Sequence, residues 1–189
     1  MKIIQADQFR TSRNRIITKR SVYNHNDRRR IDKAKLAFLK DQLLQDLTCS
    51  GVDADILARL EEYQISLDDY YIAAFQLMDG SSRINQLKDM IICQKTNSYC
   101  FRYNNLILSI YYYSDLEPVI ENCNEIIHIP GYLYSMKISA AISQLHHGAE
   151  EFPTAAFEAI HTLSLNFYST SSIAIFDSQN IQAEYILSV

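Results

Sequence analysis

Glycine and proline are scarce in this chain, and long apolar runs are missing from it. Its 189 residues include 4 Gly and 3 Pro. Scarce glycine argues against loops that hold phosphate through close backbone approach, and scarce proline argues against long flexible linkers. No apolar run approaches the ~18 residues that a membrane-spanning helix needs. We therefore expect no contact with a membrane and no phosphate-binding loop.

The sequence also shows no sign of disulfide bonding or secretion. The 4 Cys residues have no CxxC spacing anywhere. The N-terminus runs quickly into arginines, without the apolar segment of a signal peptide. We expect reduced, partly buried thiols and a cytoplasmic location.

Charge is distributed very unevenly. Residues 1–40 carry 12 Lys and Arg against 3 Asp and Glu, whereas residues 41–189 carry 6 against 19, and the net charge is -4. A body this acidic repels phosphate backbones, so we expect it not to bind DNA. Residues 1–29 are predicted to be a basic flexible arm, which could bind nucleic acid, serve as a solvated linker or contact the acidic body.

Residues 30–48 have the apolar spacing of an amphipathic helix. Gly51 is a suitable stop, and Asp53 or Asp55 can cap a second short helix. The seam of the first helix can pair two copies of the chain or dock onto the chain's own core. The candidate dimer-interface residues are Leu36, Leu39, Leu43 and Leu47.

A tyrosine-rich stretch, residues 99–113, reads as a β-hairpin. Its aromatic and aliphatic residues alternate on both sides of Asn104-Asn105, which can form a tight turn. Residues 70–78 are nearly all apolar and predict a central strand buried on both faces. Further strands are expected at 136–145 and 173–176. Helices are expected at 81–93, from 114 to a break at Pro130-Gly131, and from Pro153 with an apolar face that includes Phe157.

This order predicts an α/β (α+β) domain of the ferredoxin-like kind. A mixed, largely antiparallel sheet carries helices on its faces and follows an amphipathic helix. The expected divisions are residues 1–29, the leading helices at 30–66 and the sheet domain at 67–189.

A search for chemistry finds little. No nucleophile, nucleotide or metal motif occurs, so we predict no catalytic, cofactor-binding or metal-binding residues. Adjacent His146 and His147 point in different directions on a strand-ending turn and are expected to supply turn polarity. Asp79 ends the central strand, where α/β sites collect, but it also suits capping of the next helix. The tyrosines could stack a planar ligand, although such residues more often pack across strands.

The β-α-β-β-α-β order with a hairpin in its middle resembles the nucleotide-cyclase or GGDEF-type domain. In active members of that family the hairpin turn carries a glycine-glycine-acidic motif, and an aspartate ending the first strand holds magnesium. Asp79 matches the aspartate, but the turn here reads Asn104-Asn105. The resemblance therefore implies a degenerate, non-catalytic version.

Two further segments resemble the central region of AraC-family response regulators of the YesN type. Residues 138–167 are similar to a strand, a His-containing turn and an alanine-rich helix with an aromatic end, and residues 38–67 resemble that family's connector. The matching residues are Ala155, Ala156, Ala159, Phe167 and Tyr168.

This resemblance implies a non-enzymatic regulatory, sensor or dimerisation module of a two-component transcription regulator. It would be a homodimer whose receiver and helix-turn-helix domains lie outside this chain. Two alternatives are a divergent nucleotidyl cyclase that uses Asp79 and a small-ligand-binding domain that uses the tyrosine-rich sheet.

Overall fold

The computed structural model describes residues 32–78, 81–94, 97–133, 136–166 and 173–177. The chain divides into two compact units, Met1–Lys40 and Asp41–Val189. The unit that holds the sheet thus begins within the leading helix, well before the domain start that we expected at residue 67. The unit begins this early because buried leucines from residues 43–47 and 60–67 pack together with sheet residues in one hydrophobic core.

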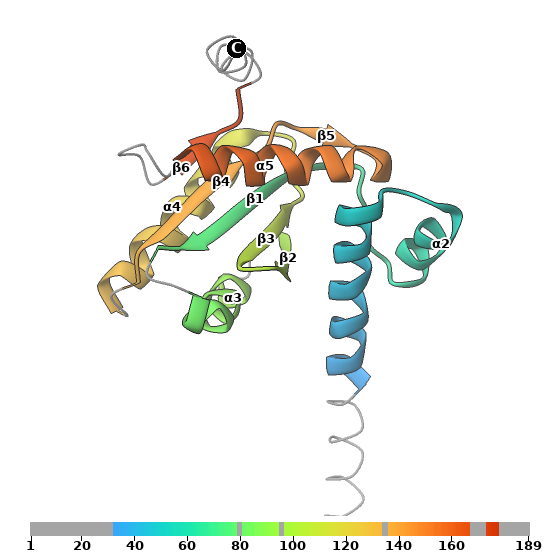
Figure 1. Ribbon diagram of the computed structural model, residues 1–189, viewed down its shortest axis with the longest axis horizontal. Coiled ribbons are helices and arrows are strands. Elements are labelled where there is room, and N and C mark those ends of the chain that lie inside the picture. Colours follow the sequence, from blue (N-terminus) through green and yellow to red (C-terminus); the bar gives the residue numbers. More distant parts are fainter. Residues whose placement is uncertain (1–31, 79–80, 95–96, 134–135, 167–172, 178–189) are drawn as a thin grey trace, which may run out of the picture. The chain divides into compact units, whose positions relative to one another are not determined.

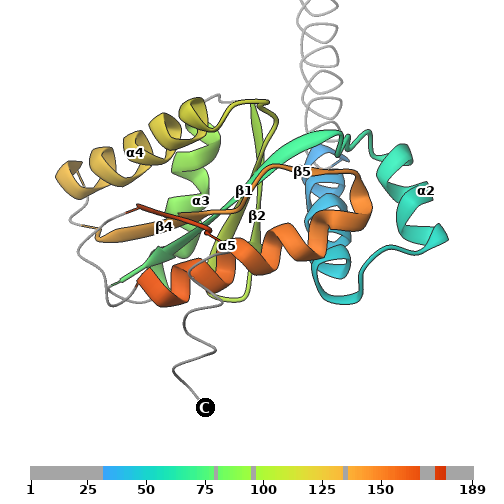
Figure 2. The same ribbon diagram turned by 90° about the horizontal axis from the view of Figure 1, so that it is seen from above.

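The sheet runs in the order β2-β3-β1-β4-β6, with the short β5 paired to β1 (Figures 1 and 2). Neighbouring strands are antiparallel except for β4 and β6, which are parallel. The expected mixed sheet flanked by helices is therefore confirmed. The strands are β1 (Asp69–Leu77), β2 (Ser98–Tyr103), β3 (Leu106–Tyr111), β4 (Ile138–Ile142), β5 (His146–His147) and β6 (Ile173–Ile175).

Helices cover both faces of the sheet, and Figure 2 shows α3 and α4 on one side and α5 on the other. The helices are α2 (Ala54–Glu62), α3 (Ile84–Cys93), α4 (Leu116–Leu133) and α5 (Phe152–Asn166), with 3-10 turns at Ser81–Arg83 (η1) and Ala149–Glu151 (η2). None of the helices among the described residues is long and apolar enough to cross a membrane.

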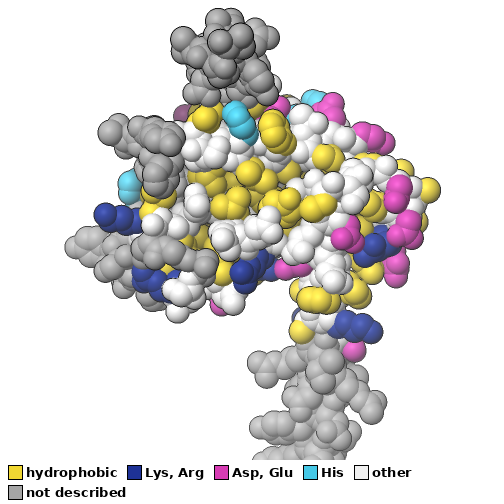
Figure 3. Space-filling view, viewed as in Figure 1, with side chains coloured by type: hydrophobic (Ala, Val, Ile, Leu, Met, Phe, Trp, Pro, Cys, Tyr) yellow, Lys and Arg dark blue, Asp and Glu magenta, His cyan; other side chains and the backbone are white. Residues whose placement is uncertain are grey.

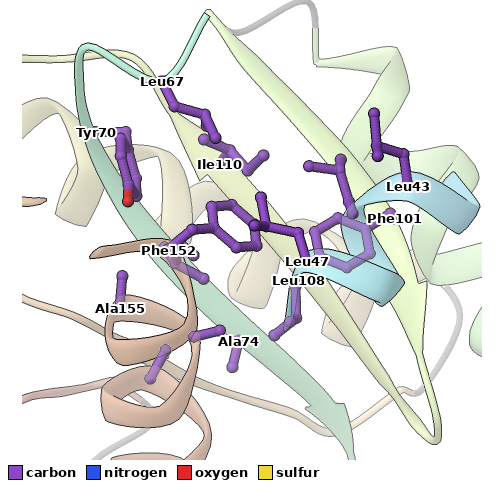
Figure 4. Close-up of a cluster of buried hydrophobic side chains, with 14 of the residues drawn as sticks. Leu43, Leu47, Leu67, Tyr70, Ala74, Phe101, Leu108, Ile110, Phe152 and Ala155 are labelled. Carbon is purple, nitrogen blue, oxygen red and sulfur yellow. The ribbon is translucent and has the colours of Figure 1, made fainter. Parts of the chain in front are cut away.

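Strand β1 supplies side chains to two hydrophobic cores, as expected for a strand buried on both faces. Alternate side chains of a strand point to opposite faces of the sheet. Tyr70, Ile72 and Ala74 enter the core beneath α5, which we call the α5 core (Figure 4). Ala73 and Phe75 enter the core beneath α3 and α4, the α3–α4 core.

The hairpin forms as predicted. Strands β2 and β3 pair antiparallel, with Tyr103 opposite Leu106. Asn104 has φ +52°, in the left-handed region that asparagine tolerates better than most residues. Strand β2 is an edge of the sheet, so its outer backbone is open to other elements of the chain.

The leading helix covers residues 32–50 and stops where we expected. Gly51 has φ +76° and donates its backbone N–H to the Leu47 carbonyl at 3.2 Å, as a helix-ending glycine does. Within the second unit, the helix is tied to the hairpin through Asp41. The Asp41 carboxylate pairs with the Lys88 ammonium and accepts the Tyr99 hydroxyl at 3.0 Å.

The expected end of one helix is wrong. Helix α4 does not break at Pro130-Gly131 but continues to Leu133. A proline removes one backbone hydrogen bond, and this loss is small for an 18-residue helix whose inner face is held by Val119, Cys123 and Ile126, all at most 1% exposed. Helix α3 has Arg83 as its N-cap, whose side chain makes no capping hydrogen bond, and the expected cap Asp79 lies outside the described residues.

The expected apolar face of α5 is also partly wrong, because Phe157 is 61% exposed. At 3.6 residues per turn, Phe157 lies well around the helix from the buried Ala155 and Ala159. The buried alanines of α5 let the helix approach the sheet closely.

Candidate functional site

A buried histidine joins three segments of the chain at one end of β1. His146 belongs to β5, which pairs antiparallel with β1 so that Tyr70 lies opposite His146 and Asp69 opposite His147. His146 is 8% exposed. The expectation that this pair only supplies turn polarity is therefore wrong for His146, because strand pairing carries its ring inward.

Two carboxylates contact the two ring nitrogens of His146. Glu158 Oε2, from α5, lies 2.8 Å from Nε2, and Glu151 Oε2, from η2, lies 3.1 Å from Nδ1. The Glu158 side chain is 10% exposed and that of Glu151 is 50% exposed. An ionised carboxylate can only accept hydrogen bonds, so the ring satisfies both contacts when both nitrogens carry protons.

The same carboxylate oxygens also hold the backbone. Glu158 Oε2 accepts the Gln144 N–H at 3.0 Å, and Glu151 Oε2 accepts the His147 N–H at 2.9 Å. The hydrogen bond from the His147 backbone is the largest influence that lowers the pKa of Glu151, and the two imidazoles lower it further. We call His146, Glu151 and Glu158 the charge cluster.

Tyr70 closes the inner side of the charge cluster. Its ring stacks on that of His146, with the centroids 6.4 Å apart, and its hydroxyl donates to the Gly148 carbonyl at 2.9 Å. Burial, with added repulsion from Glu151 and Glu150, raises the pKa of Tyr70. Tyr70 therefore stays a neutral hydrogen-bond donor at ordinary pH.

His147 faces the other way, at the surface. Its side chain is 61% exposed, and its Nδ1 lies 2.6 Å from Asp69 Oδ1. A carboxylate that orients an exposed imidazole can help it exchange a proton with solvent. In contrast, both ring nitrogens of His146 already contact carboxylates, so neither faces a substrate.

Sequence reasoning missed Glu158 because twelve positions separate it from His146. A usable signal was present, however. Glu158 lies one helical turn from Ala155 and Thr162, both of which are buried, and an acid flanking a buried stripe needs a partner. Among the described residues, no group of three or more His, Cys, Asp or Glu side chains is arranged to hold a metal ion.

The four leucines of the predicted dimer interface lie in different environments. Leu43 and Leu47 are completely buried in the α5 core (Figure 4), whereas Leu36 is 44% exposed and Leu39 is partly buried. A seam through all four would require Leu43 and Leu47 to leave the core. The expected interface is therefore corrected to exclude these two residues.

The other candidate residues from the sequence are Asp79, the two asparagines of the hairpin turn and the hairpin tyrosines. Asp79 lies outside the described residues. Asn104 and Asn105 are exposed at the hairpin tip. The hairpin tyrosines pack against both cores, Tyr99 and Tyr103 on the α5 side and Tyr113 on the other.

Acidic side chains gather on the face that carries α2 (Figure 3). Its exposed acids Asp55, Glu61 and Glu62 outnumber Arg59, whose guanidinium lies 3.7 Å from both the Asp55 and the Asp46 carboxylate. This face therefore carries more negative than positive charge, and the absence of DNA binding by the body stays a prediction.

The fold and the charge cluster define a mixed α/β domain with a buried histidine–carboxylate group at one end of its central strand. No protein-family model, no curated protein and no solved structure matches the chain.

Proposed function

We propose that this chain is a non-catalytic, dimerising regulatory module of a cytoplasmic bacterial transcription regulator. Its sequence resemblance points to the AraC-family, two-component type, with a degenerate GGDEF-like domain at its centre. The observation that carries the proposal is the change along the leading helix, from exposed apolar side chains at Leu36 and Phe38 to buried ones at Leu43 and Leu47.

The sheet topology supports the cyclase-like part of the proposal. Strands β2-β3-β1-β4 place the hairpin beside the first strand, and two helices cross between strands on one face. This is the arrangement that a β-α-β-β-α-β chain adopts in ferredoxin-like domains. The strand order therefore supports the resemblance to the cyclase-like fold, and it is an observation independent of the sequence motifs.

The hairpin tip supports a role without catalysis. Phosphoryl transfer on a nucleotide needs metal ions held by acidic groups close to the phosphates. Asn104 and Asn105 form the exposed turn, and neither supplies a carboxylate. We therefore expect no cyclic or dinucleotide product when the protein is incubated with ATP or GTP and Mg²⁺. Product formation that is lost in Asp79→Ala would overturn this part of the proposal.

Apolar exposure near the start of the helix supports dimerisation. Leu36 is 44% exposed and Leu39 is partly buried, and the two lie three positions apart on one face of the helix. Large apolar side chains in water mark contact surfaces when they cluster. A helix from a second copy offers the same side chains and can cover them in a symmetric pair.

Light scattering coupled to size-exclusion chromatography tests this interface. We expect the wild-type chain at about twice its 21.9 kDa mass, and the double variant Leu36→Asp, Leu39→Asp at the monomer mass. The matched control is Leu57→Asp on α2, because Leu57 is also 44% exposed and should not affect assembly. An unchanged dimer in the double variant, or dissociation in the control, would contradict the proposed interface.

A further inference from the structure

The charge cluster connects three neighbouring segments of the chain. His146 comes from β5, Glu151 from η2 and Glu158 from α5, and the strand β5 has only two residues. A two-residue pairing provides few backbone hydrogen bonds of its own. The side-chain hydrogen bonds of the cluster add to this pairing by joining β5 to η2 and to α5.

The proton count of the His146 ring decides how many of those contacts exist. With two protons the ring donates to Glu158 at 2.8 Å and to Glu151 at 3.1 Å. With one proton it can donate to only one carboxylate, and its other nitrogen presents a lone pair to an anionic oxygen. Loss of one proton therefore breaks one of the two contacts and makes it repulsive.

Burial determines which contact breaks. The Glu158 side chain is 10% exposed, and the cost of leaving a buried carboxylate without a donor is high. The Glu151 side chain is 50% exposed, so it can turn into water at little cost. Its departure also removes the acceptor of the His147 N–H, which lies 2.9 Å from Glu151 Oε2.

We infer that His146 is a proton-controlled clasp that fastens the η2 turn to β5. The clasp is closed when the ring carries two protons and opens at Glu151 when the ring loses one. This device depends only on contacts within residues 69–158 and does not depend on the proposed function.

Other ionisable groups face the cluster, and each has its own role. Tyr70 is neutral, and Asp69 engages the ring of the neighbouring His147 at 2.6 Å. The backbone N–H of Gly148 donates to the Asp68 carbonyl at 3.2 Å, which keeps one attachment of the turn in either state. The facing groups are Asp68, Asp69 and Tyr70 before or on β1, His147 on β5, Glu150 and Glu151 on η2 and Glu158 on α5.

Nuclear magnetic resonance on the full ¹⁵N-labelled chain can follow both halves of the device. The ring nitrogens of His146 report its protonation, and amide hydrogen exchange reports opening of the turn. Over a pH series in which the ring signals show the loss of one proton, we expect the protection of the His147 amide to fall about tenfold, after correction for intrinsic exchange. The Gln144 amide, whose acceptor is the buried Glu158, should keep its protection.

The variant Glu151→Gln supplies the decisive comparison, because this side chain is half exposed and its replacement leaves the core intact. Its His147 amide should be weakly protected at every pH and should no longer follow the His146 titration. Glu150→Gln, a change on the same turn, should behave like the wild type. A His146 ring that titrates without any change at the His147 amide would overturn the inference, and so would a ring that keeps one proton throughout.

Discussion

Phe101 of β2 and Phe152 of α5 stack with their ring centroids 6.4 Å apart, and both side chains are completely buried. Phe152 also contacts Tyr70, with the centroids 5.9 Å apart, so the first residue of α5 lies between the edge strand and the central strand (Figure 4). Leu43 and Leu47 of the leading helix belong to the same core. This aromatic row thus joins the turn after β5 to the helix that covers β2.

The variant Phe152→Ala should strongly destabilise the fold. Removing a fully buried ring leaves a cavity and costs about 3–5 kcal/mol in the free energy of unfolding. Urea denaturation followed by circular dichroism measures this loss. Phe157→Ala, on the same helix but 61% exposed, serves as the control and should change the free energy by about 0.5 kcal/mol or less. Equal losses in the two variants would show that α5 docks by a different face.

The two ends of the leading helix should respond differently to the same substitution. Leu47→Ala removes a completely buried side chain and should cost about 2–5 kcal/mol. Leu36→Ala removes a side chain that is 44% exposed and should cost far less at a protein concentration where the chain is monomeric. Denaturant midpoints measured on dilute samples provide the comparison. If Leu36→Ala proved as costly as Leu47→Ala, the distinction between a docked and an exposed part of the helix would fail.

The elements of this fold could be predicted from the sequence because their signals are local. Alternation located the hairpin, an unbroken apolar run located β1, and Gly51 and Asp53 marked the boundary between two helices. The failures concern packing. Phe157 was assigned to the buried face by its size, and Pro130 was given more weight than the docked face of α4, because neither helix orientation nor tertiary support is visible in a single sequence.

The charge cluster could not be predicted in the same way. Its members lie five and twelve positions from His146, and they meet only because a two-residue strand folds back onto β1. The leading helix shows the same limit, since one leucine repeat serves both an exposed segment and a buried one. A seam of leucines predicts that something covers it but does not say whether the partner is another copy or the chain's own sheet.

The start of α2 should depend on a single side chain. Asp53 is the N-cap, and its Oδ1 accepts the Ile56 N–H at 2.7 Å. Asp53→Ala should therefore cost about 0.5–2 kcal/mol, whereas Asp53→Asn should retain most of the stability because asparagine caps nearly as well. Asp55→Ala, in the first turn, is the control, because that side chain is 77% exposed and caps nothing. Thermal or urea unfolding of all three variants checks the order, and a loss in Asp53→Asn as large as in Asp53→Ala would argue against capping.

Acid should weaken the turn between β5 and α5 through Glu151. The His147 backbone N–H, followed by the two imidazoles, lowers the pKa of Glu151 in the folded protein. A carboxyl whose folded pKa lies below its unfolded pKa contributes stability that is complete above the unfolded value and lost as the pH falls through the folded one. While the clasp is closed, wild type should thus be more stable than Glu151→Gln, and the difference should shrink as the pH falls below about 4. Urea denaturation of both proteins across the acid range gives this difference directly, with Glu150→Gln as the neighbouring control. A difference that stayed constant with pH would mean that the amide and the carboxylate hold the turn equally well, and that the ionisation of Glu151 does not contribute.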